Sequence, residues 1–539
     1  MRVRPFCCRL APLLLFAACA APVGGWPQGS GPSGDWSAVG AAPPLAFSGA
    51  TGENVRWRTP LPETGQGGIA VQCGRVFVAT MAPWTGDGLD AADAKKFAHA
   101  TEKRAVVGKH IDAHCLDAET GELLWTRRVE GAVPSIYSYP FSDATSASPC
   151  ADDRHVWFTN GGGAVTCFTH GGEVVWTRRF TPTFDGPFNK QFEPFLVEDP
   201  ARGAGAKTFV HMEPFAAQGR DQAWNLLVGL DARTGEELWR SEDALTHYNA
   251  PTLVQSVHGP CALHARGGPH AVPERPVGLS LTRLTGADAG ARVWRYEDPR
   301  GNHEAALQTM AADARYAYWL LKQPRNLLVV LDVATGEPVR EISLTEGVRL
   351  QEAPVDGPRD AVVTTLDKGV FPVRYSMHAA GGRLYFQCYA KAWGKPTLGA
   401  PWCVAAVDPA APAGAPAVRY RELPTSRDAE SGALRWRETL SAKAVNSRGE
   451  EVTGDKRSHW DGWDWVFNGS PTRVNDHLYF TMATGTVYVV DVGDDRGPTL
   501  LALNDLGPIG ETWTANSVSY AAGRLFHRTA RELLCIGRR

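Results

Sequence analysis

The stretch Asp231-Ala-Arg-Thr-Gly-Glu-Glu-Leu-Trp239 decides the fold, because it recurs along the chain. Its copies are Asp117-Ala-Glu-Thr-Gly-Glu-Leu-Leu-Trp125, Asp332-Val-Ala-Thr-Gly-Glu-Pro-Val339, Thr169-His-Gly-Gly-Glu-Val-Val-Trp176 and Asp428-Ala-Glu-Ser-Gly-Ala-Leu-Arg-Trp436. An Asp carboxylate accepts hydrogen bonds from backbone N–H groups in a turn, and Gly adopts the positive φ of a tight hairpin. Each copy therefore predicts the end of one strand, a turn and a second strand that carries a Trp to a packing site.

A second pattern sets the length of the repeat. The residue two positions before each turn is small or β-branched, in the column Cys115, Cys167, Gly229, Ser280, Val330, Ala406, Val489 and Cys535. Longer gaps in this column indicate inserts around 345–374 and 409–465. Each repeat also holds an earlier alternating strand, such as Arg383-Leu-Tyr-Phe-Gln387. About four strands repeated every ~40–60 residues predict the blades of a β-propeller.

The column predicts an all-β, eight-bladed propeller of four-stranded blades. Its last row stops near Arg539 and lacks an outermost strand. The segment Asn54–Pro60, with Trp57 in the Trp column, reads as a lone outer strand. We expect this N-terminal strand to complete the last blade and to close the ring, which removes exposed sheet edges. Seven blades is the alternative if residues 383–491 have been divided too finely.

The first 20 residues have the layout of a secretory signal peptide. Arg2, Arg4 and Arg9 precede a short apolar run that ends in small residues, and the run is too short to span a bilayer. Cleavage after Ala20 fits a small-x-small site, whereas the residues before Cys19 resemble a lipobox and slightly favour a lipidated Cys19. The expected organisation is a signal peptide (1–20), an N-terminal extension (21–45) and a propeller (46–539), exported to the periplasm or cell envelope.

Charge and composition narrow the classes of partner. Lys and Arg number 55 and Asp and Glu 58, so the net charge is -3. A dedicated nucleic-acid binder would carry a basic field, and we predict no nucleic-acid partner. We expect contact with a membrane only through the N-terminal lipid anchor. The hydrophobic fraction of 43% is enough to build a large core.

The recurring Asp-x-x-Thr-Gly-Glu-x-x-Trp turn resembles the signature of the pyrroloquinoline-quinone-like (PQQ-like) repeat family of propellers. The resemblance covers about residues 46–539. It implies one of two functions: quinoprotein dehydrogenases hold the quinone and calcium in the central funnel, whereas other members are non-catalytic envelope lipoproteins that scaffold outer-membrane protein assembly. The segments Trp26–Gln28 and Asn54–Pro62 look like the second group.

Several dehydrogenase marks are missing from the sequence. Those enzymes stack the quinone on a vicinal disulfide, yet the only adjacent cysteines here are Cys7 and Cys8 in the leader, and no CxxCH haem motif occurs. We therefore predict no cofactor, and PQQ with calcium only if the enzyme alternative holds.

Polar and aromatic residues at the expected loops of the funnel are the candidate ligand-binding residues. A carboxylate, amides and aromatic rings that converge on one axis suit a flat polar ligand, but they equally suit the lining of a water-filled channel. The candidates are Glu193, His247, Asn249, His303, Trp465, Asn468, Trp513 and Asn516. In the enzyme alternative Glu193 is a calcium ligand or base, and Trp465 or Trp513 is the stacking floor.

Cys388 and Cys403 lie on successive strands of one expected hairpin. We predict a disulfide between them, since an exported chain can form one.

The sequence as a whole predicts an exported, non-catalytic propeller that binds an envelope protein or polymer partner. The alternative is a PQQ-dependent dehydrogenase that oxidises an alcohol or a sugar.

Overall fold

The computed structural model describes residues 24–82, 106–132, 135–136, 143–182, 193–216, 223–245, 250–267, 276–300, 310–321, 325–352, 360–373, 376–389, 402–428, 431–438, 444–449, 469–494 and 497–538. These residues form β-strands and one short 3-10 helix, η1 (Pro200–Arg202). Within these ranges, no helix has the length and apolar character that crossing a membrane requires.

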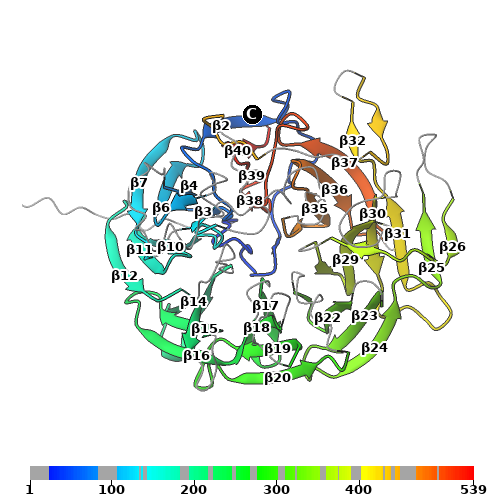
Figure 1. Cartoon of the computed structure of the whole chain (residues 1–539), viewed down its shortest axis with the longest axis horizontal. Coiled ribbons are helices and arrows are strands. Elements are labelled where there is room, and N and C mark those ends of the chain that lie inside the picture. The colour runs from blue at the N-terminus through cyan, green and yellow to red at the C-terminus, as the bar shows by residue number, and fades with distance from the viewer. Residues whose placement is uncertain are drawn as a thin grey trace, which may run out of the picture.

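Sheets surround a common axis, and in the sheets built from four consecutive strands the first strand in sequence lies innermost (Figure 1). Three consecutive sheets after the N-terminal segment contain β3 (Ala70–Gln72), β4 (Arg75–Met81), β6 (Ile111–Asp117) and β7 (Leu123–Val129); β9 (Cys150–Ala151), β10 (His155–Asn160), β11 (Ala164–Thr169) and β12 (Val174–Arg179); and β13 (Phe195–Glu198), β14 (Lys207–Ala216), β15 (Ala223–Asp231) and β16 (Glu237–Ala244).

The next two sheets have the same order. They contain β17 (Thr252–Ser256), β18 (Gly259–Arg266), β19 (Gly278–Arg283) and β20 (Arg292–Glu297); and β21 (Ala311–Ala312), β22 (Tyr316–Leu321), β23 (Leu327–Asp332) and β24 (Pro338–Ser343).

The C-terminal part of the chain adds two further regular sheets. They contain β34 (Thr472–Val474), β35 (His477–Thr481), β36 (Thr486–Asp491) and β37 (Thr499–Asp505); and β38 (Ser519–Ala521), β39 (Arg524–Arg528), β40 (Glu532–Ile536) and β2 (Val55–Pro60). A fifth strand, β1 (Ser37–Ala38), runs parallel to β34 on the inner side of the first of these sheets.

One sheet departs from the regular pattern. It contains seven strands: β25 (Val348–Gln351), β26 (Val362–Thr364), β27 (Phe371–Pro372), β28 (His378–Ala380), β29 (Arg383–Tyr389), β30 (Trp402–Val407) and β31 (Val418–Glu422). The short strands β27 and β28 share the inner position beside β29. The insert expected around 345–374 supplies β25 and β26, and β25 pairs in parallel with β31 at the outer edge.

The prediction of an eight-bladed propeller of uniform four-stranded blades is therefore wrong. The regular arrangement is seven blades with four antiparallel strands each, one of which gains the short parallel strand β1, and the sheet at 348–422 breaks the pattern with seven strands. The physical reason is that an inserted hairpin prolongs that sheet outwards, where β31 would otherwise be an exposed edge.

Two small two-stranded sheets lie outside the blades: β5 (Val106–Gly108) with β8 (Ser135–Ile136), which flank β6 and β7 in the chain, and the hairpin of β32 (Ser426–Arg427) with β33 (Leu434–Arg435). This hairpin contains the Asp428 copy of the repeated turn. That copy therefore forms a hairpin, as its sequence predicts, but it does not join the third and fourth strands of a blade.

The repeated turn has the expected geometry in the other Asp copies. The Asp231 Oδ1 accepts the backbone N–H groups of Arg233 and Thr234 at 2.8 and 3.0 Å, and Gly235 has a φ of 76°. Asp117 makes the same pair of bonds in its turn, both at 2.8 Å. These backbone bonds hold the pKa of Asp117 below its usual value.

Tryptophans connect four of the blades to the next blade. The indole N–H donates to a backbone carbonyl in the repeated turn of the following sheet in four cases: Trp57 to Ala118, Trp125 to His170, Trp176 to Ala232 and Trp294 to Val333, at 2.9 to 3.2 Å. Three of these rings lie opposite the small-residue column, in the pairs Cys535–Trp57, Cys115–Trp125 and Cys167–Trp176. The repeat thus encodes both the hairpin and the packing between blades.

The N-terminal strand closes the ring as expected. β2 pairs antiparallel with β40 as the outermost strand of the last sheet, and Trp57 lies opposite Cys535. The core lies between neighbouring sheets, as in the cluster that joins Trp125 of β7 to Phe158 and Phe168 of the next sheet.

Candidate functional site

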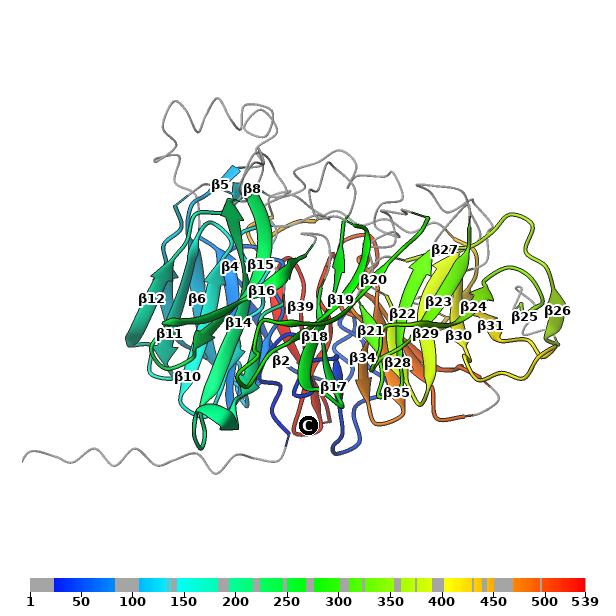
Figure 2. The ribbon, with the colours of Figure 1, turned by 90° about the horizontal axis from the view of Figure 1, so that it is seen from below.

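Residues 24–38 cross the axis on one face of the ring, where the dark blue trace runs between the sheets (Figures 1 and 2). We call them the N-terminal plug. Five sheets bind its backbone. These bonds are Ala522 N to Gly24 O, the mutual pair between Trp26 and Val71, Ala151 N to Pro27 O, Leu253 N to Gly34 O, and Arg473 N to Trp36 O, at 2.6 to 3.1 Å. The plug therefore fixes the inner ends of several blades at once.

Trp26 anchors the N-terminal plug. Its side chain is fully buried and belongs to the core cluster that also contains Val71 and Tyr520. The indole N–H donates to the Gly29 carbonyl at 3.2 Å, which folds the following turn back over the ring. Burial of a whole Trp side chain contributes on the order of 3 kcal/mol, enough to hold a short irregular segment in place.

Glu193 lies where the N-terminal plug meets the inner strands. Its carboxylate accepts the Ser148 hydroxyl at 2.8 Å and the Ser148 N–H at 3.3 Å. A side chain at Gly29 would overlap both Glu193 and Ser148, so this contact requires glycine. Burial raises the pKa of Glu193 to about 7, because water is removed from the carboxylate.

A second polar cluster lies beside the first. Asp143 accepts the Thr145 N–H at 2.8 Å and its hydroxyl at 2.6 Å, and the same hydroxyl accepts the Gln66 N–H at 2.8 Å. The buried Arg528 donates to the carbonyls of Ala79 and Gly67 at 2.6 and 3.1 Å. Burial raises the pKa of Asp143 to about 6. These bonds lie within the protein, but the Asp143 Oδ2 has no hydrogen-bond partner within the described ranges.

The other described candidates do not join Glu193. Trp513 is 2% exposed and packs in an apolar cluster with Ala144, Ala444 and Ala483. Asn516 is also buried, and its Oδ1 has no hydrogen-bond partner within the described ranges. In the same part of the chain, no group of three His, Cys, Asp or Glu residues could hold a metal ion. His247, Asn249, His303, Trp465, Asn468 and Cys19 lie outside the described residues and stay predictions.

A family model provides the deciding comparison. The model described as "Outer membrane protein assembly factor BamB" matches residues 84–201 and 109–259, which is less than half of the chain. The repeated turn continues beyond that match to Asp332 and forms the same hairpin there. The chain is a β-propeller with PQQ-like repeats in the matched residues.

Solved structures with similarity to this PQQ-like propeller include both catalytic and other proteins. BamB from Moraxella catarrhalis is 13% identical with a TM-score of 0.32, over 73% of this chain and 96% of that chain. Apo AztD from Citrobacter koseri is 13% identical with a TM-score of 0.35, over 77% and 85%. Quinohemoprotein alcohol dehydrogenase from Comamonas testosteroni is 13% identical with a TM-score of 0.33, over 96% and 81%. No curated protein sequence matches the chain. We draw no functional conclusion from these likenesses.

Cys388 and Cys403 lie directly opposite each other on β29 and β30 of this PQQ-like propeller. The expected juxtaposition is therefore present, but both residues are free cysteines in the structure. Both are buried, and burial raises the pKa of each thiol well above its usual value. They are unreactive in this state, since the thiolate is the reactive form.

Sequence reasoning missed the partners that satisfy the axial polar groups. Glu63 is 1% exposed and accepts Arg448 Nη2 at 2.6 Å and Asn446 Nδ2 at 3.2 Å, which joins two segments nearly 400 residues apart. The cluster of glycines at 65–68 was an available signal, because the backbone there approaches Thr145 and Ser148 closely.

Proposed function

We propose that this PQQ-like propeller is an exported, non-catalytic protein that binds a protein partner in the cell envelope. The N-terminal plug is the observation that carries the proposal. It fills the axis on one face with the chain's own Trp26, and the Glu193 carboxylate beside it is bonded by Ser148 of the same chain. A propeller built in this way is suited to binding on its outer surfaces rather than in an axial channel.

Two further observations support a binding role. The family description names an assembly factor, which in its own system acts with other proteins. The outermost strands also expose apolar side chains: Leu123 and Leu124 of β7 are 50% and 44% exposed, and Val174 and Val175 of β12 are 61% and 40% exposed. Outward apolar pairs on two neighbouring sheets are more typical of an interaction surface than scattered single residues.

Cross-linking in the producing cells tests the proposal. A photo-reactive residue replaces Leu124 or Val175 in the full chain with its leader, and adducts are identified by mass spectrometry. We expect the mature chain in the envelope fraction and a discrete adduct with one envelope protein. That envelope protein, once purified, should bind the purified propeller. A chain that begins at Ala21, without the leader, is the control and should give no such adduct.

Two outcomes would overturn the proposal. One is a mature chain that stays in the cytoplasm with residues 1–20 uncleaved. The other is an exported chain whose adducts are the same in kind and yield as those of a reactive residue placed at random on an unrelated exported protein.

A further inference from the structure

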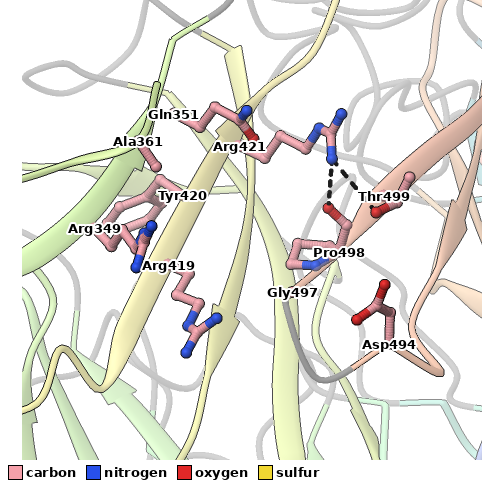
Figure 3. A pocket seen from close by; sticks show the side chains of 10 residues that line it. All are labelled: Arg349, Gln351, Ala361, Arg419, Tyr420, Arg421, Asp494, Gly497, Pro498 and Thr499. Atoms are coloured by element: carbon pink, nitrogen blue, oxygen red, sulfur yellow. Dashed lines mark hydrogen bonds between the residues drawn. The ribbon is translucent and has the colours of Figure 1, made fainter. Parts of the chain in front are cut away.

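A cavity of about 370 Å³ lies at the outer rim, between the extended edge of the seven-stranded sheet and the segment that leads into β37 (Figure 3). Arginines dominate the described lining: Arg349 on β25 and Arg419 and Arg421 on β31. Asp494, Gly497, Pro498 and Thr499 form the opposite wall. We call this cavity the rim pocket.

Strand register puts the three arginines of the rim pocket on one face of the sheet. In the parallel pair β25–β31, Arg349 lies opposite Arg419 and Gln351 lies opposite Arg421. Residues two apart on a strand point to the same face, and so do direct cross-strand partners. Like charges placed directly opposite each other destabilise a sheet by up to ~1 kcal/mol.

The rim pocket differs from the rest of the molecule in how its arginines are partnered. Arg421 Nη1 donates only to neutral acceptors, the Pro498 carbonyl at 3.3 Å and the Thr499 hydroxyl at 3.4 Å. Within the described ranges, neither Arg349 nor Arg421 forms an ion pair. Burial of Arg421 lowers its pKa, with no carboxylate to oppose the effect.

Two arginines on other outer strands have carboxylate partners. Arg128 on β7 pairs with Asp112 at 2.9 Å, and Arg178 on β12 pairs with Glu213 at 2.5 Å. Arg340 on β24 bonds to carbonyls instead, so what distinguishes the rim pocket is that Arg349 and Arg421, both without an ion pair in the described ranges, line one cavity.

We propose that the rim pocket binds a phosphate monoester. A guanidinium group donates two parallel hydrogen bonds to a phosphate, and Arg349 and Arg421 together offset the charge of a dianion. The Thr499 hydroxyl and the Gln351 amide lie on the same cavity and supply neutral donors. The volume is at the small end of ligand sites, which suits a phosphorylated small molecule or the phosphate headgroup of one lipid. This proposal does not depend on the protein partner.

Isothermal titration of the mature chain with glycerol 3-phosphate tests the rim pocket. Loss of one charge-assisted contact weakens binding by about tenfold or more, and we expect this for Arg349→Gln and for Arg421→Gln. Arg349 is exposed and makes no described ion pair, so R349Q should keep the thermal midpoint of the wild type. Its loss of binding would therefore not be a loss of fold.

Arg340→Gln is the matched control. Arg340 lies on the outermost strand β24 and donates to the Pro409 and Ala411 carbonyls of the next sheet, both at 2.7 Å, as Arg421 does to Pro498. It does not line the rim pocket, so R340Q should bind like the wild type. The second probe is vesicles of phosphatidylglycerol in phosphatidylcholine. Comparison of the two probes distinguishes a lipid headgroup from a soluble phosphate ester.

The proposal is supported if either probe binds the wild type and if both R349Q and R421Q bind that probe more weakly. The probe that binds more tightly shows whether the ligand is a soluble phosphate ester or a lipid headgroup. The proposal is overturned if neither probe binds, or if R349Q and R421Q bind both probes as well as R340Q does.

Discussion

Substitution of Gly235 by Ala should destabilise the propeller more than an ordinary turn glycine would. Gly235 has a φ of 76°, and a Cβ at this position would lie 2.7 Å from the Cδ2 and Cε3 atoms of Trp176 in the preceding sheet. The ring cannot move away freely, because its indole N–H donates to the Ala232 carbonyl in the same turn at 3.0 Å.

Two free-energy terms contribute to the effect of G235A. A left-handed conformation costs an Ala about 1–2 kcal/mol. Overpacking against the Trp176 ring adds about 1–3 kcal/mol. Gly286 isolates the first term, since it has a φ of 83° in the corresponding turn of the next sheet and a Cβ added there would meet no atom within 4 Å. We therefore expect G235A to lower the unfolding free energy by about 1–3 kcal/mol more than G286A does.

Urea unfolding followed by tryptophan fluorescence and far-UV circular dichroism measures both variants. Coincident transitions from the two probes establish that one free energy describes the unfolding. In a Trp176→Leu background the loss of unfolding free energy caused by G235A should fall to that caused by G286A, because the overlapping ring is gone. Equal losses for G235A and G286A in the wild-type background would refute the reasoning that the repeat glycine exists to receive the neighbouring Trp.

Three further predictions concern the axis and the cysteine pair. Gly29→Ala should lower the thermal midpoint and increase proteolysis near the N-terminus, because the new methyl group overlaps Glu193 and Ser148. An unchanged midpoint and an unchanged digestion pattern would contradict the close packing of Gly29 against these two residues. Burial raises the pKa of Glu193 from 4.5 in the unfolded chain to about 7. As the pH rises from 4.5 to 7, the unfolding free energy of the wild type, measured with urea, should therefore fall by up to about 3 kcal/mol relative to that of Glu193→Gln. A pH-independent difference between the two proteins would show that the carboxyl is not desolvated. Cys388 and Cys403 should resist a thiol reagent in the native protein and react after unfolding, whereas a linked peptide in a non-reducing map would establish the disulfide predicted from the sequence.

The repeated turn allowed much of the fold to be predicted. Local chemistry specifies each hairpin, because Asp231 and Gly235 act within five residues of each other. The Trp column and the small-residue column lie opposite each other in the structure, so the sequence also contained the packing between sheets. The closing strand β2 followed from the same columns.

The remaining features depend on contacts between distant segments. The parallel pairing of Arg349 with Arg419 joins strands about 70 residues apart, and nothing in either strand signals it. Residues 24–38 lack strand or helix periodicity, so the sequence suggested an extension rather than a plug. The axial candidates were chosen for residue type alone, and type does not distinguish a ligand-binding Glu193 from one that Ser148 satisfies.

Titration of the mature propeller with pyrroloquinoline quinone and calcium tests the central claim most directly. Absorbance and the thermal midpoint report binding, and dye-linked oxidation of alcohols and aldoses reports turnover. A propeller with a plugged axis that binds its partner on the outer surfaces should show no saturable change in absorbance, no stabilisation and no oxidation. Tight quinone binding with turnover, weakened by substitution of Glu193 or Trp513, would contradict the account and identify a quinoprotein dehydrogenase.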